Sequence, residues 1–171
     1  MKKGIDLYGA IYLSESASAL NSRGVYNLYN NGGSFKTIDD ELYLTSYDIS
    51  HPRWATNAKY SLYITLSQDY AVGQFVWTGF DYLGEPTPWN GKTPGSISGR
   101  GAIPNTAFFG IIDTAGFPKD TYYFYRALLK DDNYVVHIVN AWDKNNIFFI
   151  EKNKTPVHIY SNAYIIDIFR D

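Results

Sequence analysis

Two short apolar runs end in polar side chains, and a helical pattern lies between them. The first run, residues 10–13, has the length of a buried strand and is followed by Glu15. The second run, residues 72–77, is followed by Asp81. The order strand, connection, helix, strand is typical of a parallel sheet, and in α/β barrels the functional side chains lie where such strands end. We therefore expect an α/β fold.

Two segments have the periodicity of helices. Apolar residues recur every fourth position from Trp54 to Tyr70, which predicts an amphipathic helix that ends before Gly73 and packs onto a sheet. Ser50 and Pro52 provide a helix-start signal ahead of it. A second helix is predicted at about 120–130. Its broad apolar face comprises Tyr122, Phe124, Tyr125, Leu128 and Leu129.

The character of the sequence changes near Asp131. Beyond it, short β-rich segments are separated by Asn, Lys and Asp turns, which predicts an antiparallel β-sandwich. We place a domain boundary there, with an α/β unit at 1–131 and the beginning of a sandwich at 132–171. The predicted strands number fewer than a closed sandwich has. They span residues 134–139, 146–150, 156–160 and 163–169.

Composition excludes several classes of site and partner. Without cysteine, the chain has no disulfide, thiolate metal site or cysteine nucleophile, and its three scattered histidines lack the spacing of zinc ligands. The net charge of −2 gives no electrostatic reason to expect nucleic acid or an anionic membrane as a partner. No apolar run approaches the ~20 residues of a transmembrane helix. No secretory signal follows Lys2 and Lys3, so we expect a cytoplasmic protein.

Local sequence leaves the roles of two residues open. Glu15 either ends a strand as a functional carboxylate or starts a helix, with Ser14 and Ser16 as caps, and the local pattern favours the helix start. The chain has 16 Tyr, 10 Phe and 4 Trp, side chains that fill a core or pack against sugar rings. Trp77 taken alone is best explained as a core residue.

Several segments, in one continuous order and at matching intervals, resemble the barrel domain of bacterial β-galactosidases of glycoside hydrolase family 2. The resemblance covers nearly the whole chain and extends into the β-sandwich that follows the barrel in these enzymes. It implies the last two strand–helix units of a (β/α)8 TIM barrel, followed by an incomplete antiparallel β-sandwich. The segments that carry it are 13–24, 44–48, 75–89 and 109–120, with 136–138, Trp142 and 160–169 in the sandwich.

The resemblance implies roles for individual residues. Glu15 falls at the position of the family's catalytic nucleophile and would attack the anomeric carbon of a β-galactoside. Trp77 falls on a tryptophan that forms part of the galactose pocket. Ser18 stands where some relatives have a histidine near the substrate. Asp81 and Glu85 either shape the rim of the pocket or cap turns in their own loop.

The resemblance also implies parts that this sequence lacks. The family's acid/base glutamate lies in an Asn-Glu pair, which does not occur here. Phe109 stands where some relatives have an asparagine that helps to hold sodium, and no magnesium ligands are recognised, so we expect no cofactor on this chain. Only two of the eight barrel strands are expected, and two strands cannot close a barrel. The expected partners are a β-galactoside and either the missing N-terminal part or a second copy.

The resemblance therefore predicts a fragment of a retaining β-galactosidase. We expect no useful turnover from the chain alone, because loss of general acid–base catalysis costs on the order of 10²–10⁴-fold in rate. Two alternatives are a non-catalytic remnant that binds sugar through Trp77 and a fragment that functions when complemented by the N-terminal part. β-Glucuronidases fit less well, because the Asn-x-Lys motif that they carry ahead of the segment at Gly110 is not seen.

Overall fold

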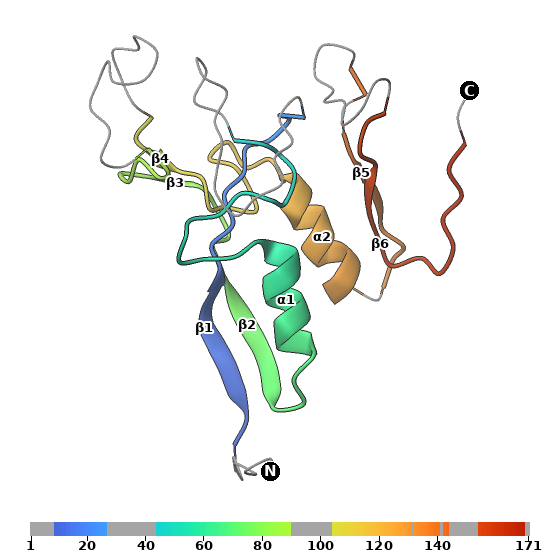
Figure 1. Ribbon diagram of the computed structural model, residues 1–171, viewed down its shortest axis with the longest axis horizontal. Coiled ribbons are helices and arrows are strands. Elements are labelled where there is room, and N and C mark those ends of the chain that lie inside the picture. Colours follow the sequence, from blue (N-terminus) through green and yellow to red (C-terminus); the bar gives the residue numbers. More distant parts are fainter. Residues whose placement is uncertain are drawn as a thin grey trace.

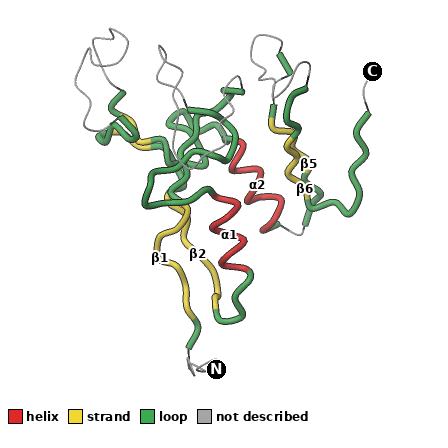
Figure 2. Tube along the Cα trace, in the orientation of Figure 1, coloured by secondary structure: helices red, strands yellow, loops and turns green. Residues whose placement is uncertain are grey.

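A computed structural model of the chain describes residues 9–26, 44–89, 104–130, 132–140, 142–143 and 154–169. Strands within these ranges form three two-stranded sheets, and two helices lie beside them (Figures 1 and 2). In chain order the elements are β1 (Ile11–Ala17), α1 (Ala58–Leu66), β2 (Ala71–Trp77), β3 (Tyr82–Leu83), β4 (Thr106–Ala107), α2 (Asp120–Leu129), β5 (Val136–Val139) and β6 (His158–Ser161).

β1 and β2 are parallel neighbours, as the sequence pattern predicts. Their register pairs Ala17 with Trp77, so the last residues of the two strands lie side by side. α1 covers one face of this sheet. On that face, the Gln74 side chain of β2 accepts hydrogen bonds from the Ser61 and Thr65 hydroxyls of α1 at 3.1 and 2.7 Å. The α/β expectation is confirmed for this unit.

The opposite face of the β1–β2 sheet is not covered by the part of the chain that the structure describes. Tyr12 and Phe75 are both exposed, and their rings meet edge to face with centroids 5.9 Å apart. Successive side chains of a strand point to opposite faces, so Phe75 lies on the face away from Gln74 and α1. The described residues form neither a closed barrel nor a sandwich.

The predicted start of the first helix is wrong. α1 begins after Asn57, whose side chain accepts a hydrogen bond from the Tyr60 N–H at 2.8 Å. The Asp48 carboxylate accepts from the N–H groups of Ala58 and Lys59 at 2.9 and 2.8 Å. Two side chains thus take up the free N–H groups of the first turn, and they fix the start seven residues after Ser50.

The predicted apolar stripe of α1 is only partly right. Trp54 lies ahead of the helix, and Trp54, Leu66 and Tyr70 are all exposed. The buried face is partly polar, because Gln74 on β2 provides hydrogen-bond acceptors for hydroxyl groups. Its members are Ala58, Ser61, Leu62 and Thr65.

α2 agrees with the second predicted helix in its bounds. Phe124 and Tyr125 are buried as expected, whereas Leu128 and Leu129 are exposed. The apolar residues gather in small clusters rather than one large core, and α2 contributes Phe124 and Tyr125 to one of them. One cluster joins Ala19, Ala58, Leu62, Phe124 and Tyr125, and a second consists of Leu20, Leu44, Trp89, Ala107 and Phe109.

β5 and β6 form an antiparallel pair that packs against α2. His137 Nε2 lies 2.6 Å from Asp120 Oδ1, and the His137 ring stacks on Tyr123 with centroids 3.9 Å apart. The domain boundary near residue 131 stays a prediction, and Asp131 itself lies outside the described residues.

Of the other two strands predicted in the C-terminal part, one is not tested and one is not found. Residues 146–150 lie outside the described residues, so that prediction is not tested. Residues 163–169 do not form a strand, and Tyr164 and Phe169 are almost fully exposed. A strand needs a neighbour to satisfy its backbone, and no described segment pairs with this one.

Candidate active site

Glu15 is an exposed residue inside β1, beside a bulge in the pairing with β2. The helix-start interpretation is therefore wrong, because β1 continues to Ala17 and no helix follows it directly. Ala17 and Ser18 have positive φ values of 63° and 55°, and the Ser18 N–H bonds to the Ser16 carbonyl at 2.9 Å. Such conformations are uncommon outside glycine and cluster at functional sites.

A cavity of about 400 Å³ lies beside Glu15. Ser18 lines the same cavity, although its side chain is buried. Trp54 and Thr56, from the segment that precedes α1, line it too. Trp54 is a site candidate that the sequence analysis missed, because it was assigned to the stripe of a helix. Its position between Pro52 and the helix cap Asn57 could have indicated a loop residue.

Trp77 is the last residue of β2 and is 39% exposed, so it is not a core residue. It does not line the cavity that Glu15 lines. Instead, its ring meets Tyr82 edge to face, with centroids 6.1 Å apart and planes at 88°. The sequence analysis placed Glu15 and Trp77 at neighbouring strand ends, and in the structure the ring contact of Trp77 is with a third residue, Tyr82.

Tyr82 contacts two of the predicted site residues, Trp77 and Glu85. Its hydroxyl donates a hydrogen bond to Glu85 Oε2 at 2.7 Å, and its ring meets the Trp77 ring edge to face. Burial and the bond to Glu85 raise the pKa of Tyr82 to about 12, and the negative charge of Glu15 contributes to the rise. Tyr82 was not predicted from the sequence, although it lies between Trp77 and Glu85 in one motif.

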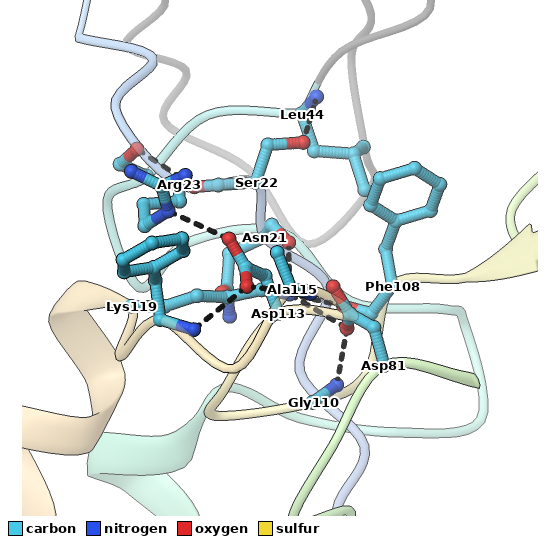
Figure 3. A network of polar contacts seen from close by, with 12 residues as sticks. Asn21, Ser22, Arg23, Leu44, Asp81, Phe108, Gly110, Asp113, Ala115 and Lys119 are labelled. Carbon is cyan, nitrogen blue, oxygen red and sulfur yellow. Dashed lines mark hydrogen bonds and ion pairs between the residues drawn. The ribbon is translucent and has the colours of Figure 1, made fainter.

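Asp81 lies in the interior, where its carboxylate has protein partners (Figure 3). Its Oδ1 accepts from the Gly110 N–H at 2.8 Å and from Lys119 Nζ at 2.7 Å. Burial raises the pKa of Asp81 and lowers that of Lys119, and the attraction within the pair opposes both shifts. These contacts favour the structural interpretation of Asp81 over a place on the pocket rim.

The polar contacts around Asp81 tie together segments that follow both parallel strands (Figure 3). Lys119 Nζ also donates to the carbonyl of Asn21 at 2.7 Å. Arg23 Nε lies 2.6 Å from Asp113 Oδ2. The segment that leads into α2 thus contacts and stabilises the stretch that follows Glu15.

Phe109 does not supply the sodium ligand that the resemblance implies for some relatives at this position. Phe109 is buried in the cluster with Leu20 and Trp89, so its side chain offers no oxygen ligand. Among the described residues, no group of three or more acidic or histidine side chains could hold a metal ion. The same residues include no helix long and apolar enough to cross a membrane.

Comparison with known proteins confirms the resemblance to β-galactosidases. No protein-family model matches the chain. It is 36% identical over 138 residues to β-galactosidase BoGH2A of Bacteroides ovatus, covering 77% of this chain and 15% of that protein. It is 34% identical over 99 residues to a putative β-glucuronidase of Formosa agariphila, covering 57% of this chain and 8% of that protein. The chain thus spans a small part of these relatives.

A solved structure supports the fold. The crystal structure of a β-glycosidase from Bacteroides vulgatus superposes with a TM-score of 0.60 and 24% identity, over 89% of this chain and 20% of that one. This likeness concerns the fold alone. Together with the sequence relatives, it makes the chain glycoside hydrolase-like.

Proposed function

We propose that this chain carries the nucleophile half of the active site of a retaining β-galactosidase. The observation that carries the proposal is the exposed carboxylate of Glu15, which lines a cavity of about 400 Å³ near the carboxyl end of β1. Trp77, partly exposed at the end of the neighbouring strand, supplies an aromatic face for a sugar ring. Ser18 lines the cavity close to the nucleophile.

The proposed reaction needs two carboxyl groups. A Glu15 oxygen attacks the anomeric carbon, the bond from that carbon to the leaving oxygen breaks, and a covalent galactosyl-enzyme forms. The leaving oxygen takes a proton from a second carboxyl group, ~5–5.5 Å from the first in retaining enzymes. Asp81 and Glu85 are held by hydrogen bonds within the chain, which makes them poor candidates for that role. We place the acid/base group in a preceding part of a longer enzyme.

The exposed face of the β1–β2 sheet supports the same proposal. Under this proposal, β1 and β2 are the last two strands of a (β/α)8 barrel. The remaining strands would cover Tyr12 and Phe75 and pair with the open edges of the sheet. Activity would then depend on complementation by those strands. β5 and β6 would begin the β-sandwich that follows the barrel.

Hydrolysis of a nitrophenyl β-galactoside by the purified chain tests the proposal that it holds only half a site. We expect no useful turnover. Measured turnover that is abolished in Glu15→Gln would show that the acid/base group is on this chain and would contradict the proposal. Turnover that survives in Glu15→Gln would contradict the assignment of the nucleophile.

A second candidate function is that of a sugar-binding remnant, which the partial exposure of Trp77 favours. Galactose titration followed by tryptophan fluorescence tests it. Saturable quenching that disappears in Trp77→Ala would support binding at this residue. A flat response in the wild-type chain would contradict it.

A further inference from the structure

We propose that Tyr82 and Glu85 are positioning residues that hold the indole of Trp77 in place at the carboxyl end of β2. The inference rests on the proposed function in one respect, since it takes the exposed face of Trp77 as the platform for a sugar ring. It assigns Glu85 a different role from a contact at the pocket rim. It also assigns a role to Tyr82, which the sequence pattern did not single out.

The contacts of Glu85 are the first support. Its Oε2 accepts the hydrogen bond from the Tyr82 hydroxyl at 2.7 Å, and its Oε1 accepts one from the Thr87 hydroxyl at 2.9 Å. Hydrogen bonds to a carboxylate are stronger than those between neutral groups. Each oxygen of Glu85 thus has a partner within its own loop, so this exposed carboxylate is oriented by Tyr82 and Thr87.

The second support is the orientation of Tyr82 relative to Trp77. Their rings meet edge to face, with centroids 6.1 Å apart and planes at 88°. Because the phenol hydroxyl donates to Glu85, the ring that contacts Trp77 is itself anchored by that carboxylate. The direction of the contacts therefore runs from Trp77 to Tyr82 to Glu85.

The third support is that Tyr82 rests on a rigid base. Its backbone lies in β3 and pairs with Ala107 of β4. Its ring packs against the apolar cluster that contains Trp89 and Phe109. The Trp77 side chain, at the end of a strand, can change its orientation unless neighbouring groups restrict it. Packing against Tyr82, whose own position is fixed, restricts that motion.

Solvent exchange of the Trp77 indole proton measures the restriction directly. The indole ¹⁵N–¹H signal of the chain is identified as the one that disappears in Trp77→Phe. Tyr82→Phe removes the hydrogen bond that anchors the ring to Glu85. We expect it to shift the Trp77 signal and to speed its exchange by roughly two- to tenfold, the range for the loss of one net hydrogen bond. Glu85→Ala should act in the same direction. Glu85→Gln retains an oxygen acceptor for Tyr82 and should restore exchange toward the wild-type rate.

Tyr63→Phe is the matched control, because Tyr63 is an exposed tyrosine on α1 far along the chain from this loop. It should leave the Trp77 signal unchanged. An unchanged signal and exchange rate in Tyr82→Phe would overturn the inference, as would equal effects of Glu85→Gln and Glu85→Ala. Far-ultraviolet circular dichroism confirms that each variant is folded.

Galactose affinity separates this inference from the proposed function. If Tyr82→Phe speeds exchange and also weakens galactose binding several-fold, both are supported. If exchange changes and galactose affinity does not, Tyr82 and Glu85 hold Trp77, and the role of Trp77 as a platform for the sugar is contradicted. If the wild-type chain binds no galactose, the sugar-binding function fails, and the exchange rates alone decide whether Tyr82 and Glu85 hold Trp77.

Discussion

Lys119 Nζ lies 2.7 Å from Asp81 Oδ1, and the two side chains are only 1% and 4% exposed. Removing one partner leaves the other charge buried and unpaired, which typically costs about 3–5 kcal/mol. We expect Lys119→Met and Asp81→Ala each to lower the free energy of unfolding by that amount in urea titrations. The double variant should lose less than the sum, because neither charge is then left alone.

A surface ion pair provides the control. Lys130 Nζ lies 3.5 Å from Asp132 Oδ2, with both side chains more than half exposed. Exposed pairs contribute about 0–1 kcal/mol, so Asp132→Asn should change stability little. Equal losses from Asp132→Asn and Asp81→Ala would contradict the structural role of the buried pair.

Gly110 is required by a close approach of two backbone segments. A Cβ at this position would lie 2.0 Å from the Asp81 nitrogen and 2.3 Å from the Phe80 carbonyl carbon. Gly110→Ala should therefore destabilise the chain by about 3 kcal/mol or prevent folding. Gly79→Ala is the matched control, since nothing described lies within 4 Å of a Cβ there. Thermal melts of both variants compare them, and equal melting temperatures would show that the two segments do not meet as described.

Two buried tyrosines differ in the partner of the hydroxyl group. Tyr26 donates to Asp120 Oδ2 at 3.0 Å, whereas the hydroxyl of Tyr125 has no hydrogen-bond partner among the described residues. Tyr26→Phe removes a bond to a charged group and should cost about 1.5–3 kcal/mol. Tyr125→Phe leaves no described partner unpaired and should stay within about 0.5 kcal/mol of wild type or stabilise the chain. Chemical denaturation measures the stability of both variants. A larger loss in Tyr125→Phe than in Tyr26→Phe would contradict these contacts.

His158 should make stability depend on pH. Burial and the charge of Lys59 lower the pKa of His158 below its usual 6.5. The unfolded chain therefore binds the proton more tightly, so this contribution is complete above about pH 6.5 and is lost as the pH falls toward the lower folded value. The melting temperature should decrease from about pH 7 to about pH 5.

The part of this decrease that comes from His158 is found by substitution. His158→Gln should show a smaller decrease than wild type, whereas His51→Gln, at a histidine elsewhere in the chain, should keep the wild-type decrease. A decrease of the same size in His158→Gln would contradict the assignment to His158.

Sequence periodicity and composition predicted the elements whose signals are local. The parallel pair of β1 and β2 was predicted from two apolar runs with a helical pattern between them. α2 was predicted from the periodic apolar residues of its own segment. The start of α1 was misplaced because Ser50 and Pro52 were taken as the start signal in place of the local cap Asn57. The second contribution comes from Asp48, ten residues ahead of Ala58, which accepts two N–H groups of the first turn. No rule based on neighbouring residues contains that contact.

The site was predicted in part for a similar reason. Glu15 and Trp77 could be proposed because they lie at strand ends, and a resemblance to a known family pointed to both. Tyr82 and Trp54 were missed because their proximity to the site arises from how the loops fold back. The burial of Asp81 depends on Lys119, 38 residues away in the chain, so the motif alone could not separate a rim carboxylate from an internal one.

The central claim is that Glu15 is the nucleophile, and covalent trapping tests it most directly. The reagent is a dinitrophenyl galactoside in which fluorine replaces the hydroxyl group next to the anomeric carbon. Attack by Glu15 forms a bond to the anomeric carbon while dinitrophenolate leaves with its electron pair, so no acid group is required. Mass spectrometry of the digested chain should find one fluorogalactosyl group on the peptide that contains Glu15, and none in Glu15→Gln. An unlabelled Glu15 peptide, or equal labelling of Glu15→Gln, would contradict the account.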